Sequence, residues 1–444
     1  MKKLIILFIC IITFKAQAQL IETLGIGISS ASGTVKVLYT DTINNILYAG
    51  GKFNLVGGKK CWGIAKWNGL EWDSLGIGIS ENGFVQNVTD IVSFNNEIII
   101  CGPFQSCGGK VIQGIARWDG TDWFSIGGSV DSAWESVQRL EVYNNELYAI
   151  GYFTRIGGVP TNGIAKWNGQ NWIDLSQGFN LDCGSAIQSR AIRHFNNELY
   201  LVGNYNCPND ERIMKRVNNQ WVQVGSDITG DFWLNNLTIF KNKLYVSGYF
   251  FAPYATDNGI FSFDGTNFEN TNGGALPSNV WNTFEYKDEL YVSGQIDFAG
   301  GQPIGRLAKW DGDQWLNTNI NTAGTIYAMA EYNGKLIVGG FINDINGTGV
   351  TNLASIDFDA VGINNVNSTS YFKLYPNPTN STFSIELSNF SNSKGISIYN
   401  AVGQLMLPQK TAEKTFDVSS YAKGMYVVEV QTDKGISRQK LIVK

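Results

Sequence analysis

The chain of 444 residues is poor in the residue types that carry most metal chemistry and most nucleic-acid binding. It has a single histidine, His194, only 16% charged residues and a net charge of −5. Copper sites built from several histidines therefore lack their ligands. A nucleic-acid surface needs a basic face, and the chain has no basic cluster to form one. We expect no metal, no cofactor and no nucleic-acid partner.

Long apolar runs are also missing, except at the start of the chain. Two lysines precede an apolar run at residues 4–14, and the small residues Ala16-Gln17-Ala18 follow it. This order is typical of a secretory signal with its cleavage site, and the run is too short to stay in a bilayer. We predict a signal peptide at residues 1–18. A lipoprotein signal at Cys10 is the alternative, which the two large apolar residues before it disfavour.

Glycine and aromatic residues are abundant, and they are arranged in a repeat. The chain has 50 Gly, 25 Phe, 19 Tyr and 13 Trp, a mixture that suits many short strands. The segment LYAGGKF (47–53) returns at intervals of about fifty residues, which indicates a repeat architecture. The copies share one glycine each, at Gly51, Gly102, Gly151, Gly203, Gly248, Gly294 and Gly340.

Each copy contains four runs with the pattern of β-strands. In the third copy they are residues 137–143, 147–153, 163–167 and 171–176. Asn-Gly or a similar turn joins the last two, which is a strong hairpin signal. Four antiparallel strands in each of seven copies predict a seven-bladed β-propeller at residues 19–362.

The ends of the repeat region predict how the ring closes. The seventh copy runs to LASIDF (353–358) and then stops one strand short. TLGIGIS (23–29) nearly duplicates SLGIGIS (74–80), the fourth strand of the first copy. We therefore expect a strand from the N-terminus to complete the last blade, which would leave no sheet edge exposed.

A hydrophobic strand ending in glycine, then a glycine pair and a tryptophan, resembles kelch-type repeats and galactose-oxidase-like propellers. The chain departs from kelch repeats in its shorter W-N/D-G-x-x-W hairpin. The resemblance implies a fold, whereas propellers host unrelated functions. The copper chemistry of galactose oxidase is not expected, because its histidine ligands are missing.

The paired tryptophans of GIAKWNGLEW (63–72) return at 114–123 and 163–172. They could form a ladder that stacks on sugar rings, or they could hold the blades together. The fifth copy carries Phe263 and Phe268 instead, so bulk and apolarity suffice at these positions. We therefore favour packing.

The last part of the chain has a different character. Residues 363–370 are small and polar and predict a linker. Residues 371–444 read as alternating strands with Pro, Asn and Gly turns, which predict a small Ig-like β-sandwich. As a set they are similar to the type A C-terminal sorting domain of the type IX secretion system (T9SS). The matching residues are Pro376, Asn377, Pro378, Gly403, Gly424 and Tyr426.

This resemblance implies a cellular destination rather than an activity. It implies passage through the periplasm to the outer cell surface or the medium. The partners it implies are the type IX machinery, a sortase-like protease that removes the domain, and surface lipopolysaccharide after sorting.

An oxidising compartment permits disulfides. Cys183 and Cys207 fall on one inferred face of the fourth blade, so we predict that they pair. Cys61 and Cys107 occupy corresponding loops of neighbouring blades and form a second candidate pair. Cys101 lies inside a strand, and we expect it to remain a buried thiol.

The candidate ligand-binding residues are aromatics outside the repeat, just ahead of the first strand of several blades: Phe84, Trp134, Trp233 and Trp281. Rigid rings at the channel mouth could bind a sugar or a protein, or they could simply cover the blade ends. The sequence thus favours a binding or adhesion module. The alternatives are a polysaccharide hydrolase or lyase with Asp/Glu chemistry, and a structural surface component. No catalytic residue is predicted, and His194 is expected to be a half-exposed strand residue.

Overall fold

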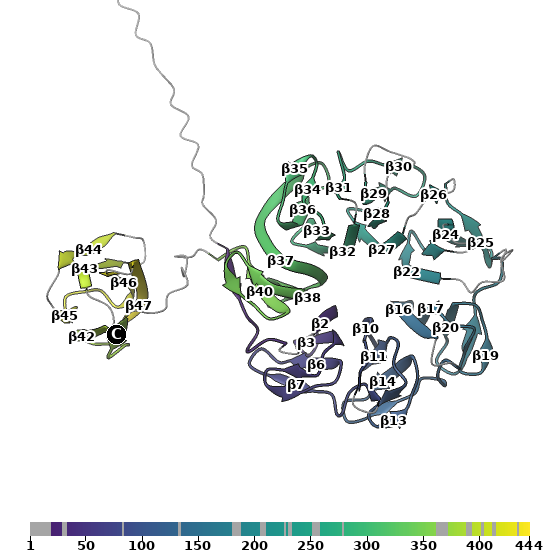
Figure 1. Ribbon diagram of the computed structural model, residues 1–444, viewed down its shortest axis with the longest axis horizontal. Coiled ribbons are helices and arrows are strands. Elements are labelled where there is room, and N and C mark those ends of the chain that lie inside the picture. Colours follow the sequence, from purple (N-terminus) through teal and green to yellow (C-terminus); the bar gives the residue numbers. More distant parts are fainter. Residues whose placement is uncertain are drawn as a thin grey trace, which may run out of the picture. The chain divides into compact units, whose positions relative to one another are not determined.

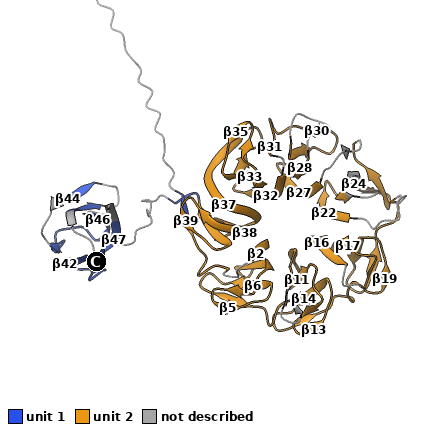
Figure 2. Ribbon diagram, in the orientation of Figure 1, with its two compact units in different colours: residues 1–20, 358–444 blue, residues 21–357 orange. Residues whose placement is uncertain are grey.

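A computed structural model describes residues 19–444 except 29–32, 82–83, 132–134, 180–187, 205–209, 226–227, 230–232, 251–257, 278, 361–371, 388–392, 401–403, 411–413 and 433–434. The described elements are all strands. The chain divides into two compact units, Ile21–Asp357 and Phe358–Lys444, the second grouped with the residues up to Leu20 (Figure 2). The signal peptide and the linker lie outside the described residues and stay predictions.

The third repeat shows how each copy folds. Its strands β16 (Ser136–Tyr143), β17 (Glu146–Tyr152), β20 (Ile164–Trp167) and β21 (Trp172–Asp174) pair in that order, all antiparallel. Asn144 and Asn145 have positive φ angles, which asparagine tolerates well, and so they form the tight turn between β16 and β17. The strand order predicted for this repeat is confirmed.

The other repeats form corresponding sheets. Four of these orders are β2 (Thr34–Asp41), β3 (Ile46–Lys52), β6 (Ile64–Trp67), β7 (Trp72–Ser74); β10 (Asp90–Phe94), β11 (Glu97–Cys101), β14 (Ile115–Trp118), β15 (Trp123–Phe124); β22 (Gln188–Phe195), β23 (Glu198–Asn204), β24 (Asp210–Val217), β25 (Gln220–Gln223); and β27 (Trp233–Phe240), β28 (Lys243–Tyr249), β29 (Ile260–Phe263), β30 (Phe268–Glu269).

The last two repeats share one long strand, β37 (Trp315–Tyr332). Its first part completes the sheet of β32 (Asn279–Tyr286), β33 (Glu289–Gln295) and β36 (Arg306–Trp310). Its second part pairs with β38 (Lys335–Ile345), which is followed in the sheet by β40 (Leu353–Asp357) and β1 (Leu20–Glu22).

Short strands lie in the connections between the main strands. They are β4 (Leu55–Val56), β5 (Lys59–Lys60), β8 (Ser80–Glu81), β9 (Phe84–Val85), β12 (Ser106–Cys107), β13 (Lys110–Val111), β18 (Arg155–Ile156), β19 (Val159–Pro160), β26 (Ile228–Thr229), β31 (Ala275–Leu276), β34 (Phe298–Ala299), β35 (Gln302–Pro303) and β39 (Thr348–Gly349).

The sheets are arranged in a ring with the first strand of each repeat innermost (Figure 1). Each inner strand contacts the next in the order β2, β10, β16, β22, β27, β32, β37, and β37 contacts β2 again. A closed ring of radially arranged antiparallel sheets is a β-propeller.

A strand from the N-terminal segment does complete the last sheet, but its position differs from the prediction. The strand is β1 (Leu20–Glu22), whereas the segment expected to form it turns. Gly25 and Gly27 have φ angles of 63° and 74°, and the amide of Ile28 donates to the Thr351 carbonyl at 3.1 Å. The described part of this motif, residues 24–28, is therefore the connection that follows the strand.

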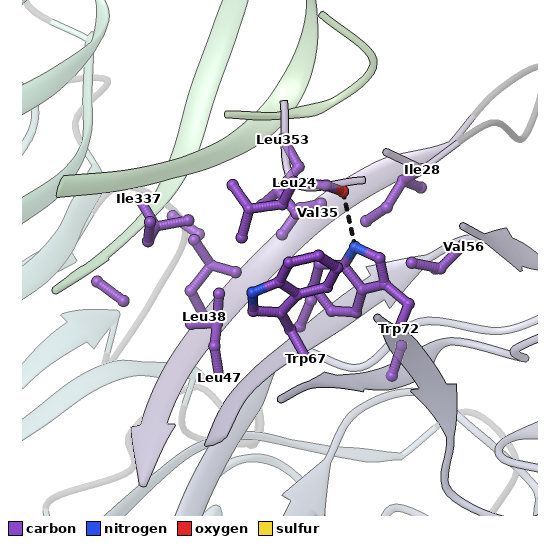
Figure 3. Packing of buried hydrophobic residues seen from close by; sticks show 14 of the residues in the cluster. Leu24, Ile28, Val35, Leu38, Leu47, Val56, Trp67, Trp72, Ile337 and Leu353 are labelled. Carbon is purple, nitrogen blue, oxygen red and sulfur yellow. Dashed lines mark hydrogen bonds between the residues drawn. The ribbon is translucent and has the colours of Figure 1, made fainter. Parts of the chain in front are cut away.

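That connection accepts a hydrogen bond that closes the ring. The indole nitrogen of Trp72 donates to the Leu24 carbonyl at 2.8 Å, and the ring of Trp67 packs against Trp72 (Figure 3). The same bond joins other neighbouring blades, in the pairs Trp123–Leu75, Trp172–Ile126, Trp221–Leu175 and Trp315–Thr271. The repeated tryptophans are thus packing residues, as predicted, because their rings are covered between blades.

The shared glycines have a common steric cause. In β3, Gly51 lies opposite Val35 and Gly50 opposite Val37, so Lys36 forms a β-bulge in the inner strand. A Cβ on Gly51 would lie 2.1 Å from the Thr34 carbonyl oxygen, and one on Gly248 would lie 1.9 Å from that of Trp233. Among the described pairings, six of the seven shared glycines lie opposite such a bulge, which the missing side chain permits. Bulge residues of the other blades include Gln138, Arg190, Asn235, Trp281 and Tyr327.

The C-terminal unit contains two sheets around one apolar core. The first is β41 (Phe372–Tyr375), β42 (Thr382–Leu387) and β45 (Thr415–Asp417). The second is β44 (Leu405–Lys410), β43 (Ser393–Asn400), β46 (Gly424–Thr432) and β47 (Gly435–Val443). Their buried side chains form one cluster, which includes Phe383 and Phe416 from the first sheet and Val428 and Leu441 from the second.

Two residues of the sorting-domain motif have clear structural roles in this unit. The Asn377 side chain donates to the Lys440 carbonyl at 2.6 Å and accepts from the Ile442 amide at 2.9 Å. These bonds fix the start of the unit to its last strand. The Tyr426 hydroxyl donates to the Ala422 carbonyl at 2.8 Å. Gly403 lies outside the described residues.

The cysteine predictions require one correction. Cys61 and Cys107 are separate free thiols, so the disulfide predicted between them is not formed. The two side chains are buried in different hydrophobic clusters, one centred on the first blade and one on the second. Cys101 is a buried thiol, as expected. Burial raises the pKa of Cys61 to about 11. The pair Cys183–Cys207 lies outside the described residues and stays a prediction.

Candidate functional site

A cavity of about 490 Å³ lies at the centre of the ring. Its walls come from the inner strands β16, β22, β27 and β32, with part of β17. Since β22 and β27 lie between β16 and β32 in the ring, a cavity touched by all four faces the ring axis. The lining residues are Gln138, Arg139, Gly151, Tyr152, Gln188, Ser189, Arg190, Asn235 and Trp281.

The bulges explain why these side chains reach the cavity. Gln138, Arg190, Asn235 and Trp281 are the bulge residues of four different blades. A bulge inserts an extra residue that the partner strand does not pair, and it redirects that side chain. One register position, repeated around the ring, thus supplies a glutamine, an arginine, an asparagine and a tryptophan to one cavity.

Trp281 forms the aromatic part of the wall. Its indole nitrogen is buried and has no hydrogen-bond partner among the described residues. Its ring meets the ring of Tyr327 edge to face at 5.8 Å, and the Lys36 ammonium lies 3.5 Å from the centre of the Tyr327 ring. A buried N–H without a partner is a costly group. It is therefore available to a ligand that supplies an acceptor.

Trp233 lies next to the same cavity through its contact with Arg190. The Arg190 guanidinium is 5.7 Å from the Trp233 ring centre, and the Tyr249 ring is 6.0 Å from it. Trp233 is 52% exposed, an unusual exposure for so large an apolar side chain. The arrangement extends the aromatic surface from the cavity outward.

The electrostatics at the ring centre are dominated by cations. Burial, together with the neighbouring positive charge of Arg139, lowers the pKa of Lys36. Arg139 donates to the Thr89 carbonyl at 2.8 Å and to the Gln138 carbonyl at 3.2 Å. These acceptors are neutral, so they fix the guanidinium in place without cancelling its charge.

Asp90 is close enough to Arg139 for the two to influence each other's charge, but it is not among the residues that line the cavity. Its two oxygens accept from the Leu140 amide at 2.8 Å and from the Ile91 amide at 2.9 Å. Burial raises the pKa of Asp90, against the opposite effects of Arg139 and of the two amides. The described residues that line the cavity include no carboxylate.

The structure brings together only part of the predicted site. Trp281 lines the cavity and Trp233 adjoins it, whereas Trp134 lies outside the described residues and Phe84 is described only as backbone of β9. Sequence reasoning missed the polar lining residues, because single polar residues in strands look ordinary. The signal that could have found the bulge residues is their fixed spacing before the shared glycine. These missed residues are Gln138, Arg139, Gln188, Ser189, Arg190 and Asn235.

A second cavity, of about 760 Å³, surrounds His194 between the third and fourth blades. His194 lies in strand β22 and is of intermediate exposure as a residue, whereas its side chain is only 7% exposed and stacks on Tyr143 at 3.8 Å. Lys166 and the Tyr148 hydroxyl both bond the Glu146 carboxylate at 2.7 Å. Neither serine nor cysteine is among the described residues that line this cavity. Lys166 is neutralised by Glu146, and Arg216 donates to the Leu175 carbonyl at 2.6 Å. We rank this cavity second because its lysine already has an anionic partner.

The described part of the chain contains no cluster of three or more His, Cys, Asp or Glu side chains that could hold a metal ion. Within the same residues, no helix is long and apolar enough to cross a membrane.

Residues 373–444 match the family of secretion system C-terminal sorting domains. The two-sheet C-terminal unit is thus a sorting domain of the type IX secretion system, and such a domain marks a protein for secretion to the cell surface or beyond.

The fold has relatives among solved structures. The chain resembles the extracellular domain of the one-component system BT4673 from B. thetaiotaomicron, with a TM-score of 0.52 and 11% identity over 96% of this chain and 59% of that one. The extracellular domain described as the hybrid two-component system BT4673 matches with a TM-score of 0.51, also at 11% identity, over 96% of this chain and 58% of that one. The chain therefore spans less than two thirds of these relatives, and at this identity the likeness concerns the fold alone.

A curated relative is Ulvan lyase NLR42 from Nonlabens ulvanivorans, which is 38% identical over 74 residues. The match covers 16% of this chain and 14% of the lyase. So short a segment does not transfer the activity of that enzyme to this chain.

Proposed function

We propose that the protein is a seven-bladed propeller with kelch-like repeats that works as a secreted binding or adhesion module for a glycan or a protein. In this proposal its type A, Ig-like sorting domain is recognised by the type IX machinery and removed by a sortase-like protease. The propeller is then released or attached to surface lipopolysaccharide.

One observation carries the binding role: the cavity at the ring centre is lined by aromatic, amide and cationic side chains. Ligand sites in proteins combine apolar surface with a few placed polar groups in cavities of this size. The unpartnered indole nitrogen of Trp281 adds a donor for a ligand that supplies an acceptor.

The rival function is a hydrolase or lyase that cleaves polysaccharide with Asp or Glu side chains. Glycoside hydrolysis generally needs two carboxylates that flank the scissile bond. The cavity lining includes none among the described residues, and both Asp90 oxygens are held by backbone amides. This favours binding over hydrolysis.

The test compares the full chain with Trp281→Ala on a glycan array and in pull-downs from cell-surface extracts. We expect the wild type to retain ligands that Trp281→Ala loses. The matched control is Phe341→Ala, which removes an aromatic that is 55% exposed on β38, away from the cavity lining. Equal loss in both variants, or no ligand for the wild type, would contradict the proposal.

A further inference from the structure

Three cationic side chains come from the inner strands of three blades. Lys36 comes from the first blade, Arg139 from the third and Arg190 from the fourth. Lys36 and Arg139 are close enough for each to feel the other's charge, and within the described residues neither forms an ion pair. Holding like charges together away from water is unfavourable unless an anion joins them.

Half-buried cations in the middle strands of the blades behave differently. Lys166 pairs with Glu146 at 2.7 Å and Lys309 pairs with Glu289 at 2.7 Å. In each pair the carboxylate comes from the second strand of the same sheet and the lysine from the third. The propeller thus supplies internal partners for cations within the sheets. It supplies none for Arg139, which lines the cavity, or for Lys36, which adjoins the cavity through Tyr327 and Trp281.

Asp90 does not fill that role. Its oxygens accept from the Leu140 and Ile91 amides, and although Asp90 and Arg139 are close enough to influence each other's charge, no ion pair joins them within the described residues. The Lys36 ammonium is held instead over the Tyr327 ring at 3.5 Å, a contact that stabilises a cation without neutralising it.

The neutral part of the lining matches a polyhydroxylated ring. The amides of Gln138, Gln188 and Asn235 both donate and accept hydrogen bonds, as sugar hydroxyls do. The Ser189 hydroxyl is 2% exposed, lines the cavity and has no partner among the described residues. Beside these groups, Trp281 offers a flat apolar surface of the kind that accepts the C–H face of a sugar.

We propose that the ring centre binds an acidic saccharide, with the carboxylate or sulfate group held by Lys36 and Arg139 and the sugar ring resting on Trp281. This inference rests on the proposed binding function and names the ligand class for the same cavity.

The test is calorimetric titration of the full chain with matched saccharide pairs. One pair is oligogalacturonate and its carboxyl-reduced form, and the other is a sulfated oligosaccharide and its desulfated form. We expect the acidic member of at least one pair to bind about tenfold more tightly, or better, because charge-assisted hydrogen bonds are the strong ones. The pair that shows the difference distinguishes carboxylate from sulfate.

One variant and its control test whether the preference for the acidic member depends on Lys36. Lys36→Gln should weaken binding of the acidic member about tenfold and leave the neutral member unchanged. Lys66→Gln is the control, because Lys66 is comparably half-buried in β6 but pairs with Asp73 at 3.9 Å. Tryptophan fluorescence of each variant verifies folding, and added salt should weaken only the acidic ligand.

The outcomes separate the two proposals. Equal affinity for acidic and neutral members, or full affinity in Lys36→Gln, would overturn the acidic-saccharide inference and leave a binding module in place. A protein captured in pull-downs without any saccharide binding would also overturn it. Absence of any glycan or protein ligand would overturn both.

Discussion

The outer hairpins and the inner bulges of the propeller occupy equivalent places in successive blades, yet their sequences behave in opposite ways. Five hairpins repeat one solution, an indole that donates to the preceding blade. Six bulges carry six different residues: Lys36, Gln138, Arg190, Asn235, Trp281 and Tyr327. Packing imposes the same demand on each blade, whereas a single ligand on the ring axis meets a different group from each.

The largest effect is expected at an outer hairpin. Trp123 is fully buried and its indole donates to the Leu75 carbonyl at 2.8 Å. Trp123→Ala should lower the free energy of unfolding by about 4 kcal/mol through the cavity and the lost bond. Denaturant unfolding followed by tryptophan fluorescence measures it for the propeller alone, because all 13 tryptophans precede residue 316.

Paired Phe substitutions extend this prediction to both regions. Trp123→Phe should cost about 1–2 kcal/mol, since it keeps the ring and leaves the Leu75 carbonyl unpaired. Trp281→Phe at the ring centre should cost less, because its indole nitrogen has no described partner to lose. If Trp281→Phe were the more costly change, Trp281 would be a packing residue and the contrast between the regions would fail.

The second effect concerns the glycine that permits a bulge. Gly248→Ala places a Cβ 1.9 Å from the Trp233 carbonyl oxygen, so the backbone must shift. We expect a loss of about 2–3 kcal/mol in unfolding free energy, typical of overpacking. The control is Gly349→Ala, where a Cβ meets nothing within 4 Å. Equal stability of the two variants would show that the bulge does not depend on the glycine.

Much of the fold could be predicted from the sequence, because the same packing contacts recur in successive blades and a recurring pattern is visible in a sequence. The glycines, the Asn turns and the paired tryptophans gave the strand order of each blade. The strand that closes the ring was predicted in the wrong segment. TLGIGIS has the pattern of a strand, but Gly25 and Gly27 have positive φ angles and form turns there. The cavity could not be predicted in the same way. Which side chains meet across the ring depends on bulge register, which shows only as a fixed spacing before the shared glycine, and on ring closure, which leaves no pattern within one blade.

The smallest effect on stability is expected in the outer hairpin turns, where either Asp or Asn accepts the hydrogen bonds of the turn. The Asp119 carboxylate accepts from the Thr121 and Asp122 amides, and the Asn168 carbonyl oxygen accepts from Gln170 and Asn171 in the equivalent turn. These bonds hold the pKa of Asp119 at about 2, below its ordinary value of 3.8. A depressed folded-state pKa gives stability that is present above the unfolded value and is lost as the pH falls through the folded one.

Asp119→Asn keeps an acceptor in the turn but removes the titration. The difference in unfolding free energy between wild type and variant should therefore be constant above about pH 4 and shrink towards pH 2. Measuring this difference between two chains cancels the carboxylates they share. A difference that does not change with pH would mean that the carboxylate adds nothing beyond the amide. Asn and Asp would then be fully interchangeable in the hairpin turns, in contrast to the charged residues at the ring centre.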